Sequence, residues 1–290
     1  MNAPSIIFPH LNIEINYLPD GFDIFGLRIN FYGILIAIGM VLGVLVALSR
    51  AKKTGQRPDD YIDIAIFSII FGIIGARLYY VLFNLDYYLK NPLEIINIRQ
   101  GGLAIYGGVI AGVITMFVIS RIKKISLLMV LDTCAPGVAL AQAFGRWGNF
   151  FNREAFGEYT DSLFAMQIKY SEVGNGISES IKNNIIEKNG TEYIQVSPTF
   201  LYESAWCLVL FILIIIFRKF QQYNGEVILW YVGGYALERT FVEGLRTDSL
   251  YVGDTGIRIS QLLSIILLAG SFIVLVVMRI RIWTGKMKIE

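Results

Sequence analysis

"INFYGILIAIGMVLGVLVALS", residues 29–49, contains no charged residue and is long enough to cross a lipid bilayer as one α-helix. A spanning helix needs roughly 20 mostly apolar residues. Six further segments of this kind follow along the chain, at about 62–83, 103–120, 127–147, 199–217, 226–243 and 259–278. Helices and closed barrels are the structures that satisfy their own backbone polar groups in lipid. The sequence therefore predicts an all-α polytopic membrane protein with seven transmembrane helices.

The composition of the 290-residue chain is typical of a membrane protein. Hydrophobic residues make up 55% and charged residues 17%, whereas a soluble domain carries about 45–50% and about 25%. The net charge of +2 provides no basic field for nucleic acid. Cys134 and Cys207 lie in apolar segments, so we expect no disulfide framework, metal centre or other cofactor. His10, the only histidine, precedes every spanning segment, which argues against a histidine-dependent triad within the helices.

Basic residues in the connections predict the orientation of the chain. Lysines and arginines gather after the first, third, fifth and seventh spanning segments, so we expect the amino terminus outside and the carboxyl terminus in the cytoplasm. The first residues lack the pattern of a cleavable signal peptide, and the first spanning helix is expected to act as the targeting signal. We predict one membrane-embedded domain, 1–290, with a small extracytoplasmic lobe of strand and helix at 158–196, between the fourth and fifth helices.

Several ionisable residues lie within or at the ends of the predicted spans. Such residues are costly in lipid unless they are paired or hydrated, so each is a candidate for function. We expect those near the cytoplasmic ends to be structural, while Arg77 suits either a structural or a functional role. The full set is Asp63, Arg77, Asp132, Arg146, Glu203, Glu238, Arg239 and Glu243.

The arginines toward the predicted outer leaflet recur at helical spacing. Arg146 and Asn149 are three residues apart, and Arg239, Glu243 and Arg246 are spaced by four and then three, so each set shares one helix face. The spacing of Arg239 and Glu243 suits an ion pair. Because the planar fork of arginine matches a phosphate group, these residues predict a site that binds a phospholipid headgroup.

Glycine pairs occur at the start of the third predicted helix, in "GGLAIYGGVIAG", residues 101–112. Small residues let two helices, or a helix and a ligand, approach closely. We expect tight helix packing here rather than a cradle for a ligand.

The motif "GRWGNFFNREAFG", residues 145–157, resembles the signature of the bacterial prolipoprotein diacylglyceryl transferases, which are seven-helix enzymes of the cytoplasmic membrane. Further matches are "NFYGILIAIG", "GARLYYVLF", "GGLAIYGGVIAG", "SPTFLYES", "RTFVEGLRTD" and "ISQLLS". The 158–196 lobe is the part without a useful match.

The resemblance implies a reaction and a set of site residues. Such enzymes move the diacylglyceryl group of phosphatidylglycerol to the lipobox cysteine of a prolipoprotein signal peptide, forming a thioether and releasing glycerol phosphate at the outer leaflet. Arg146 and Arg239 fall on essential arginines of the family. The other matching positions are Asn149, Glu154, Gly157, Tyr32, Glu243 and Arg246.

The chain departs from the family where some members carry histidines: it has Tyr106 and Ser197 at these positions. A phenol that titrates near about pH 10 is a poor base at neutral pH, so we expect electrostatic stabilisation to supply most of the rate. Arg146 and Arg239 would hold the phosphate, with Arg77 as a further binding residue. Tyr106 would hydrogen-bond the headgroup or orient the thiol. Either Glu154 or Glu243 would orient the arginines and accept the proton.

Two other classes of protein have similar requirements. A phospholipid-binding or flipping protein also needs outward arginines, but it needs neither the signature nor a path for a peptide cysteine. A structural membrane component would use arginines as interface anchors, which scatter rather than recur at helical spacing. We therefore favour the transferase.

Overall fold

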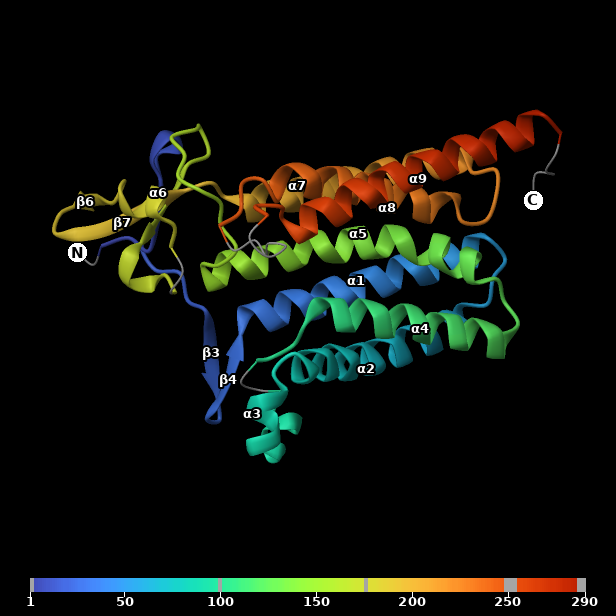
Figure 1. Cartoon of the computed structure of the whole chain (residues 1–290), viewed down its shortest axis with the longest axis horizontal. Coiled ribbons are helices and arrows are strands. Elements are labelled where there is room, and N and C mark those ends of the chain that lie inside the picture. Colours follow the sequence, from blue (N-terminus) through green and yellow to red (C-terminus); the bar gives the residue numbers. More distant parts are fainter. Residues whose placement is uncertain (1–2, 99–100, 175–176, 248–254, 286–290) are drawn as a thin grey trace. The chain divides into compact units, whose positions relative to one another are not determined.

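The computed structural model describes residues 3–98, 101–174, 177–247 and 255–285. Its contacts divide the chain into two compact units, one made of residues 1–43 with 135–290 and the other of residues 44–134. Figure 1 colours the elements of both by sequence. Helices α1 and α5 each begin in one unit and end in the other.

All seven segments predicted to span the membrane are helical. They are α1 (Phe31–Lys53), α2 (Pro58–Leu82), α4 (Ile105–Lys123), α5 (Leu127–Asn152), α7 (Thr199–Phe217), α8 (Glu226–Val242) and α9 (Ile259–Trp283). Among the described residues, six of these helices are long and apolar enough to cross a membrane, so the chain is a polytopic membrane protein. The remaining expected span corresponds to α8, whose 17 residues fall short of that length.

In the first unit, α1 lies against α5 through small residues. A Cβ atom added to Gly43 would come within 2.8 Å of the carbonyl oxygen of Gly137, and one added to Gly39 within 2.9 Å of that of Ala141. Such spacings leave no room for a larger side chain. Lipid gives two helices no hydrophobic reason to associate, so close backbone packing at small residues holds this pair together.

In the second unit, α2 and α4 lie side by side (Figure 1) and use the predicted glycine pair in the same way. A Cβ atom on Gly75 would lie 2.7 Å from the carbonyl oxygen of Gly107. This contact confirms the expected role of the 101–112 glycines in helix packing. At the other end of the pair, Nζ of Lys123 lies 2.5 Å from Oδ2 of Asp63, which gives Asp63 a structural partner. Between α2 and α4 lie α3 (Leu85–Lys90) and the 3-10 helix η2 (Pro92–Ile96).

A five-stranded antiparallel sheet occupies the end of the first unit beyond α5 and α7 (Figure 1). Its order is β2-β1-β5-β7-β6, and its strands are β1 (Ile6–Phe8), β2 (Ile13–Ile15), β5 (Met166–Lys169), β6 (Ile186–Lys188) and β7 (Thr191–Val196). Ile6 pairs with Ile168, which pairs with Ile194, and all three are fully buried.

The sheet differs from the expected 158–196 lobe, and from the expected all-α fold, because it includes strands from the amino-terminal segment. The 158–196 segment contains three strands and the short helix α6 (Glu179–Lys182), but the amino-terminal strands β1 and β2 complete the same sheet. Two short strands are too brief to be recognised in the sequence without their partners. The apolar core of the sheet includes Phe150 at the end of α5 and Phe200 at the start of α7, so it is packed directly on the helices. A separate hairpin, β3 (Gly21–Ile24) with β4 (Leu27–Asn30), leads directly into α1.

Candidate functional site

Glu203 on α7 is the centre of a cluster of arginines in the first unit. Its side chain is 1% exposed. The Nε atom of Arg146, from α5, forms an ion pair with its Oε2 atom. Nη1 of Arg239, from α8, lies 3.4 Å from Oε1, and Nη1 of Arg246, just after α8, lies 3.5 Å from the same oxygen. Three arginines that are far apart in the sequence therefore converge on one buried carboxylate.

A second carboxylate fixes Arg239 from its own helix. Nη2 of Arg239 forms an ion pair with Oε2 of Glu243, four residues further along the chain, and the Glu243 side chain is also buried. The ion pair predicted from the spacing is confirmed. Two carboxylates thus set the pose of one guanidinium, which limits its rotamers and directs its remaining donors.

Aromatic and hydroxyl side chains surround Arg146. Its Nη2 atom lies 3.4 Å from the hydroxyl of Tyr235 on α8. Tyr235 stacks on Tyr231, whose hydroxyl donates to Oε1 of Gln142 at 2.9 Å. The Tyr235 hydroxyl thus contacts the guanidinium at a different nitrogen from the one that faces Glu203, so Arg146 needs little reorganisation to bind an anion.

Glu238, near the carboxyl end of α8, is a third glutamate beside Glu203 and Glu243. It is 4% exposed, and neither of its carboxyl oxygens has a hydrogen-bond partner among the described residues. Its carboxyl group lies within electrostatic range of Glu203, Arg239, Arg146 and Arg246. Glu238 therefore belongs to the cluster electrostatically without sharing its ion pairs.

The signature motif continues past the end of α5 into a tight turn. Nδ2 of Asn149 donates to Oε1 of Glu154 at 3.0 Å, and the backbone N–H of Glu154 donates back to the carbonyl of Asn149 at 3.0 Å. Arg153 and Ala155 adopt left-handed backbone conformations, with φ of 53° and 55°. Glu154 accepts hydrogen bonds from the side chains of Asn149 and Asn152, so of the two expected orienting glutamates it is Glu243 that holds an arginine.

Tyr32, in the first turn of α1, lies against this part of α5. A Cβ atom on Gly148 would overlap the Tyr32 ring, which explains the glycine at that position. The phenol interacts electrostatically with Glu154 and Arg146. Tyr32 is thus brought next to the signature residues, as the resemblance implies.

Gly157 ends the signature at a crossing of three backbone segments. It forms an isolated antiparallel bridge with Arg246, and its N–H donates to the carbonyl of Ser197 at 2.9 Å. A Cβ atom on Gly157 would lie 2.9 Å from the carbonyl oxygen of Leu245 and 2.9 Å from Cβ of Ser197. The glycine allows the backbone that carries Arg246 to approach, so it positions one of the clustered arginines.

Two expected site residues, Arg77 and Tyr106, belong to the second unit. The guanidinium of Arg77 donates all five of its N–H groups to backbone carbonyls of the following loop, those of Glu94, Ile95, Asn97, Gly101 and Gly102. The rings of Tyr80 and Tyr88 cover it. With every donor engaged, Arg77 fastens the loop and has no hydrogen left for a phosphate. Tyr106 lies in the first turn of α4 and is partly exposed.

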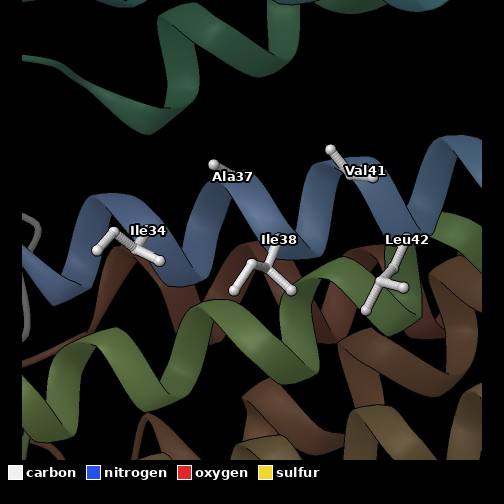
Figure 2. Close-up of a pocket in the computed structure, with 5 residues that line it drawn as sticks. All are labelled: Ile34, Ala37, Ile38, Val41 and Leu42. Carbon is white, nitrogen blue, oxygen red and sulfur yellow. The ribbon is translucent and has the colours of Figure 1, made fainter.

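A hollow of about 350 Å³ runs along one face of α1 (Figure 2). Its lining residues are all aliphatic and recur at helical spacing: Ile34, Ala37, Ile38, Val41 and Leu42. Such a surface offers contacts to an acyl chain and no group for chemistry. Among the described residues, no set of three or more His, Cys, Asp or Glu side chains is arranged to hold a metal ion.

The chain is similar to known proteins over most of its length. Residues 19–277 match the family model described as prolipoprotein diacylglyceryl transferase. Three relatives are named phosphatidylglycerol–prolipoprotein diacylglyceryl transferase. That of Clostridioides difficile (strain 630) is 42% identical over 252 residues, 87% of this chain and 92% of the relative. That of Finegoldia magna is 44% identical over 251 residues, 86% and 91% of the two chains. That of Staphylococcus aureus (strain Newman) is 40% identical over 275 residues, 93% of each.

The chain belongs to the prolipoprotein diacylglyceryl transferase family. Arg146 of the signature, Arg239 near the end of α8 and Arg246 just after it meet in one place in the transferase. Glu203 was among the ionisable candidates of the sequence analysis but was assigned no role, and Tyr235 was not considered, because nothing in the local sequence shows which arginines they face. One signal was available for Glu203: three cations at membrane depth require a buried counter-charge.

Proposed function

We propose that the cluster of Arg146, Arg239 and Arg246 around Glu203 holds the phosphate of phosphatidylglycerol during diacylglyceryl transfer. As a member of its family, the chain transfers a diacylglyceryl group from phosphatidylglycerol to prolipoproteins. The convergence of three arginines on one buried carboxylate carries the proposal. A preformed set of cations in a weakly hydrated site is well suited to a phosphate group.

The proposed acceptor is the thiol of the lipobox cysteine in the signal peptide. The thiol first releases its proton to water, and the resulting thiolate sulfur attacks the glyceryl carbon that bears the phosphate. The carbon–oxygen bond breaks, its electron pair leaves with the oxygen, and glycerol phosphate departs as a thioether forms. Negative charge grows on the phosphate during this step, and Arg146 and Arg239 are the groups that stabilise it. Because the nucleophile comes from the substrate, the enzyme need not supply a reactive side chain.

The two ion-paired carboxylates are proposed to tune the cluster rather than to react. The three arginines exceed Glu203 and Glu243 by one positive charge, which matches one phosphodiester monoanion. Glu203 keeps the guanidiniums together when the site is empty and shares them when phosphate enters.

Other signature residues are proposed to shape the binding site. Asn149, held by Glu154, and Tyr32 would contact the headgroup, while Gly157 supports the backbone of Arg246. Tyr106 remains a proposed contact for the headgroup or the thiol. Arg77 is not included, because its donors are satisfied by the loop.

The proposed topology has seven spans, including α8. Gly157 pairs with Arg246, so these residues lie on the same side of the membrane. Helices α7 and α8 lie between them in sequence, and if α7 crosses the membrane, α8 has to cross back. In the same way, β1 pairs with β5, which supports an even number of crossings by the four candidate spans between them, α1, α2, α4 and α5.

We place the amino terminus and the sheet outside and the carboxyl terminus in the cytoplasm, because the connections after α1, α4, α7 and α9 are basic. The protein would then be a multi-pass protein of the bacterial cytoplasmic membrane, with its arginine cluster toward the outer leaflet, where a secreted signal peptide and phosphatidylglycerol both have access.

Transfer to a lipobox peptide tests the proposal directly. The purified protein is reconstituted with phosphatidylglycerol, a lipobox peptide is added, and the thioether-linked diacylglyceryl peptide is measured by mass spectrometry. Arg239→Ala is expected to lower turnover by about 10²–10³-fold, the usual loss when an oxyanion-stabilising donor is removed. A peptide with serine in place of cysteine is the control. Near-normal turnover of Arg239→Ala would contradict the phosphate site, and a protein that only binds or flips lipid would yield no thioether at all.

A further inference from the structure

Glu238 differs from the other buried glutamates of the described chain in its contacts. Glu203 and Glu243 each face at least one arginine in the cluster, and Glu226, at the opposite end of α8, lies 2.5 Å from Nη2 of Arg279. Glu238 is 4% exposed, yet both of its carboxyl oxygens have no hydrogen-bond partner among the described residues. Its environment is therefore that of a buried acid that receives no donor.

Burial of a carboxylate without hydrogen bonds or a paired cation is strongly unfavourable, and such a group takes up a proton instead. The neighbours of Glu238 have opposite effects on its ionised form. Glu203 repels its negative charge, while the arginines favour it but already face other carboxylates. The charged and titratable groups that interact with it from α5, α7, α8 and the segment after α8 are Arg146, Glu203, Cys207, Tyr235, Arg239 and Arg246.

We propose that Glu238 is protonated in the resting enzyme and acts as a positioning residue whose neutral form preserves the positive charge of the phosphate site. This proposal rests on the phosphate site described above. With Glu238 neutral, the three arginines exceed Glu203 and Glu243 by one charge. With Glu238 ionised, the cluster has no net charge, and its arginines gain a third carboxylate that competes with the phosphodiester.

A coupling between headgroup and proton follows from this arrangement. A phosphate that enters the cluster repels the ionised form of Glu238 and favours the protonated form. By linkage, the protonated enzyme must bind phosphatidylglycerol more tightly than the ionised enzyme does. The effect concerns the affinity for the lipid, because Glu238 is proposed to touch neither the thiol nor the carbon under attack.

The first test measures the apparent KM for phosphatidylglycerol from about pH 5 to about pH 9 at saturating peptide. In the parent enzyme KM is expected to rise by up to about tenfold per pH unit once Glu238 ionises. In Glu238→Gln, which mimics the neutral acid, KM should stay near the low-pH value of the parent enzyme. The pH dependence of kcat, which includes the ionisation of the peptide thiol, should be similar in both.

The second test detects the proton without relying on activity. The infrared spectrum of the parent enzyme near neutral pH should contain a protonated-carboxyl band that Glu238→Gln lacks. Glu226→Gln is the matched control from the same helix. Glu226 forms an ion pair with Arg279, and its replacement should leave that band unchanged.

The outcomes separate this proposal from the phosphate site on which it depends. If Arg239→Ala abolishes transfer but KM follows pH identically in the parent enzyme and in Glu238→Gln, the role of Glu238 is wrong while the site stands. If the infrared spectra of the parent enzyme and of Glu238→Gln contain the same protonated-carboxyl band, the role of Glu238 is likewise wrong. If Arg239→Ala transfers normally, the phosphate site itself is wrong. Should Glu238→Gln fail to fold, Glu238→Met offers a second neutral variant, and the parent enzyme alone can be titrated by infrared.

Discussion

Arg146 forms an ion pair with the buried Glu203 that joins the signature motif on α5 to the amino-terminal part of α7. The next residues on both helices repeat the connection: Nε1 of Trp147 donates to Oγ of Ser204 at 3.1 Å. Polar contacts of this kind across adjacent helices specify how the helices are aligned, because leaving any one of these groups unpaired in lipid is costly. The pair therefore supports both the fold of the first unit and its site.

The guanidinium geometry of Arg146 is expected to matter more than its charge. Arg146→Lys keeps the positive charge but cannot reach Glu203 through Nε and Tyr235 through Nη2 at the same time. We predict a fall in turnover of about 10²-fold, measured by transfer to the lipobox peptide. Arg121→Lys, on the exposed end of α4 over the ring of Phe117, is the control and should keep its activity. Equal turnover of Arg146→Lys and the parent enzyme would show that the fork plays no part.

Gly157→Ala is expected to disturb the arginine cluster by displacing the backbone that carries Arg246. The new methyl group would lie 2.9 Å from the Leu245 carbonyl oxygen, so the segment that carries Arg246 has to move. We predict a loss of about 1–3 kcal/mol in the free energy of unfolding, as for other overpacked sites, together with a higher KM for the lipid.

The matched control is Gly112→Ala on α4, where an added Cβ atom has open space around it. Alanine is a better helix former than glycine, so this variant should be as stable as the parent or more stable by roughly 0.5–1 kcal/mol. The interpretation of Gly157 fails if both variants melt at the same temperature.

Arg77→Met is expected to free the loop after α2. Five backbone carbonyls would lose their donor, while the apolar side chain of methionine still fills the space below the tyrosine rings. We predict a loss of roughly 3 kcal/mol or more in stability and faster amide exchange in residues 94–98. Direct binding of phosphatidylglycerol, measured at a temperature where the variant is folded, should be changed far less than in Arg239→Ala. A comparable loss of lipid binding would return Arg77 to the set of phosphate ligands.

The stability of the five-stranded sheet should depend on pH through Tyr193. Burial raises the pKa of Tyr193 above its usual value, and Glu14 and Glu172 raise it further. Its hydroxyl donates to the carbonyl of Pro4 at 2.8 Å. Because the folded state favours the protonated phenol, this contribution to stability is complete below the unfolded value of about pH 10 and is lost as the pH rises above it.

The measurement is the melting temperature of the parent enzyme and of Tyr193→Phe between about pH 8 and about pH 11. The parent enzyme should melt at a higher temperature than Tyr193→Phe at the low end of this range, and the difference should shrink as the pH increases. A constant difference across this range would mean that Tyr193 does not titrate differently in the folded and unfolded chains.

Local sequence predicted the helices and the ion pair between Arg239 and Glu243, for a clear physical reason. Uninterrupted apolar segments determine where helices form in lipid, and helical spacing shows that Arg239 and Glu243 pair. Glu203 meets Arg146 only after α5 and α7 have packed, and nothing in either segment encodes that meeting. Arg77 is the converse case. An arginine in a spanning segment indicates function by default, but here the following loop supplies every acceptor that its guanidinium can use.

The position of β1 between β2 and β5 in the sheet has a consequence for biosynthesis. Its neighbour β5 comes after four of the candidate spans, α1, α2, α4 and α5, so the first strand can only form a hairpin with β2 until those helices have been made and inserted. Closure of the sheet is then a late event that depends on correct insertion of everything in between. A helix inserted with the wrong orientation would leave β1 and β5 on opposite sides of the bilayer. The exposed edge of an unfinished sheet would mark such a chain for quality control.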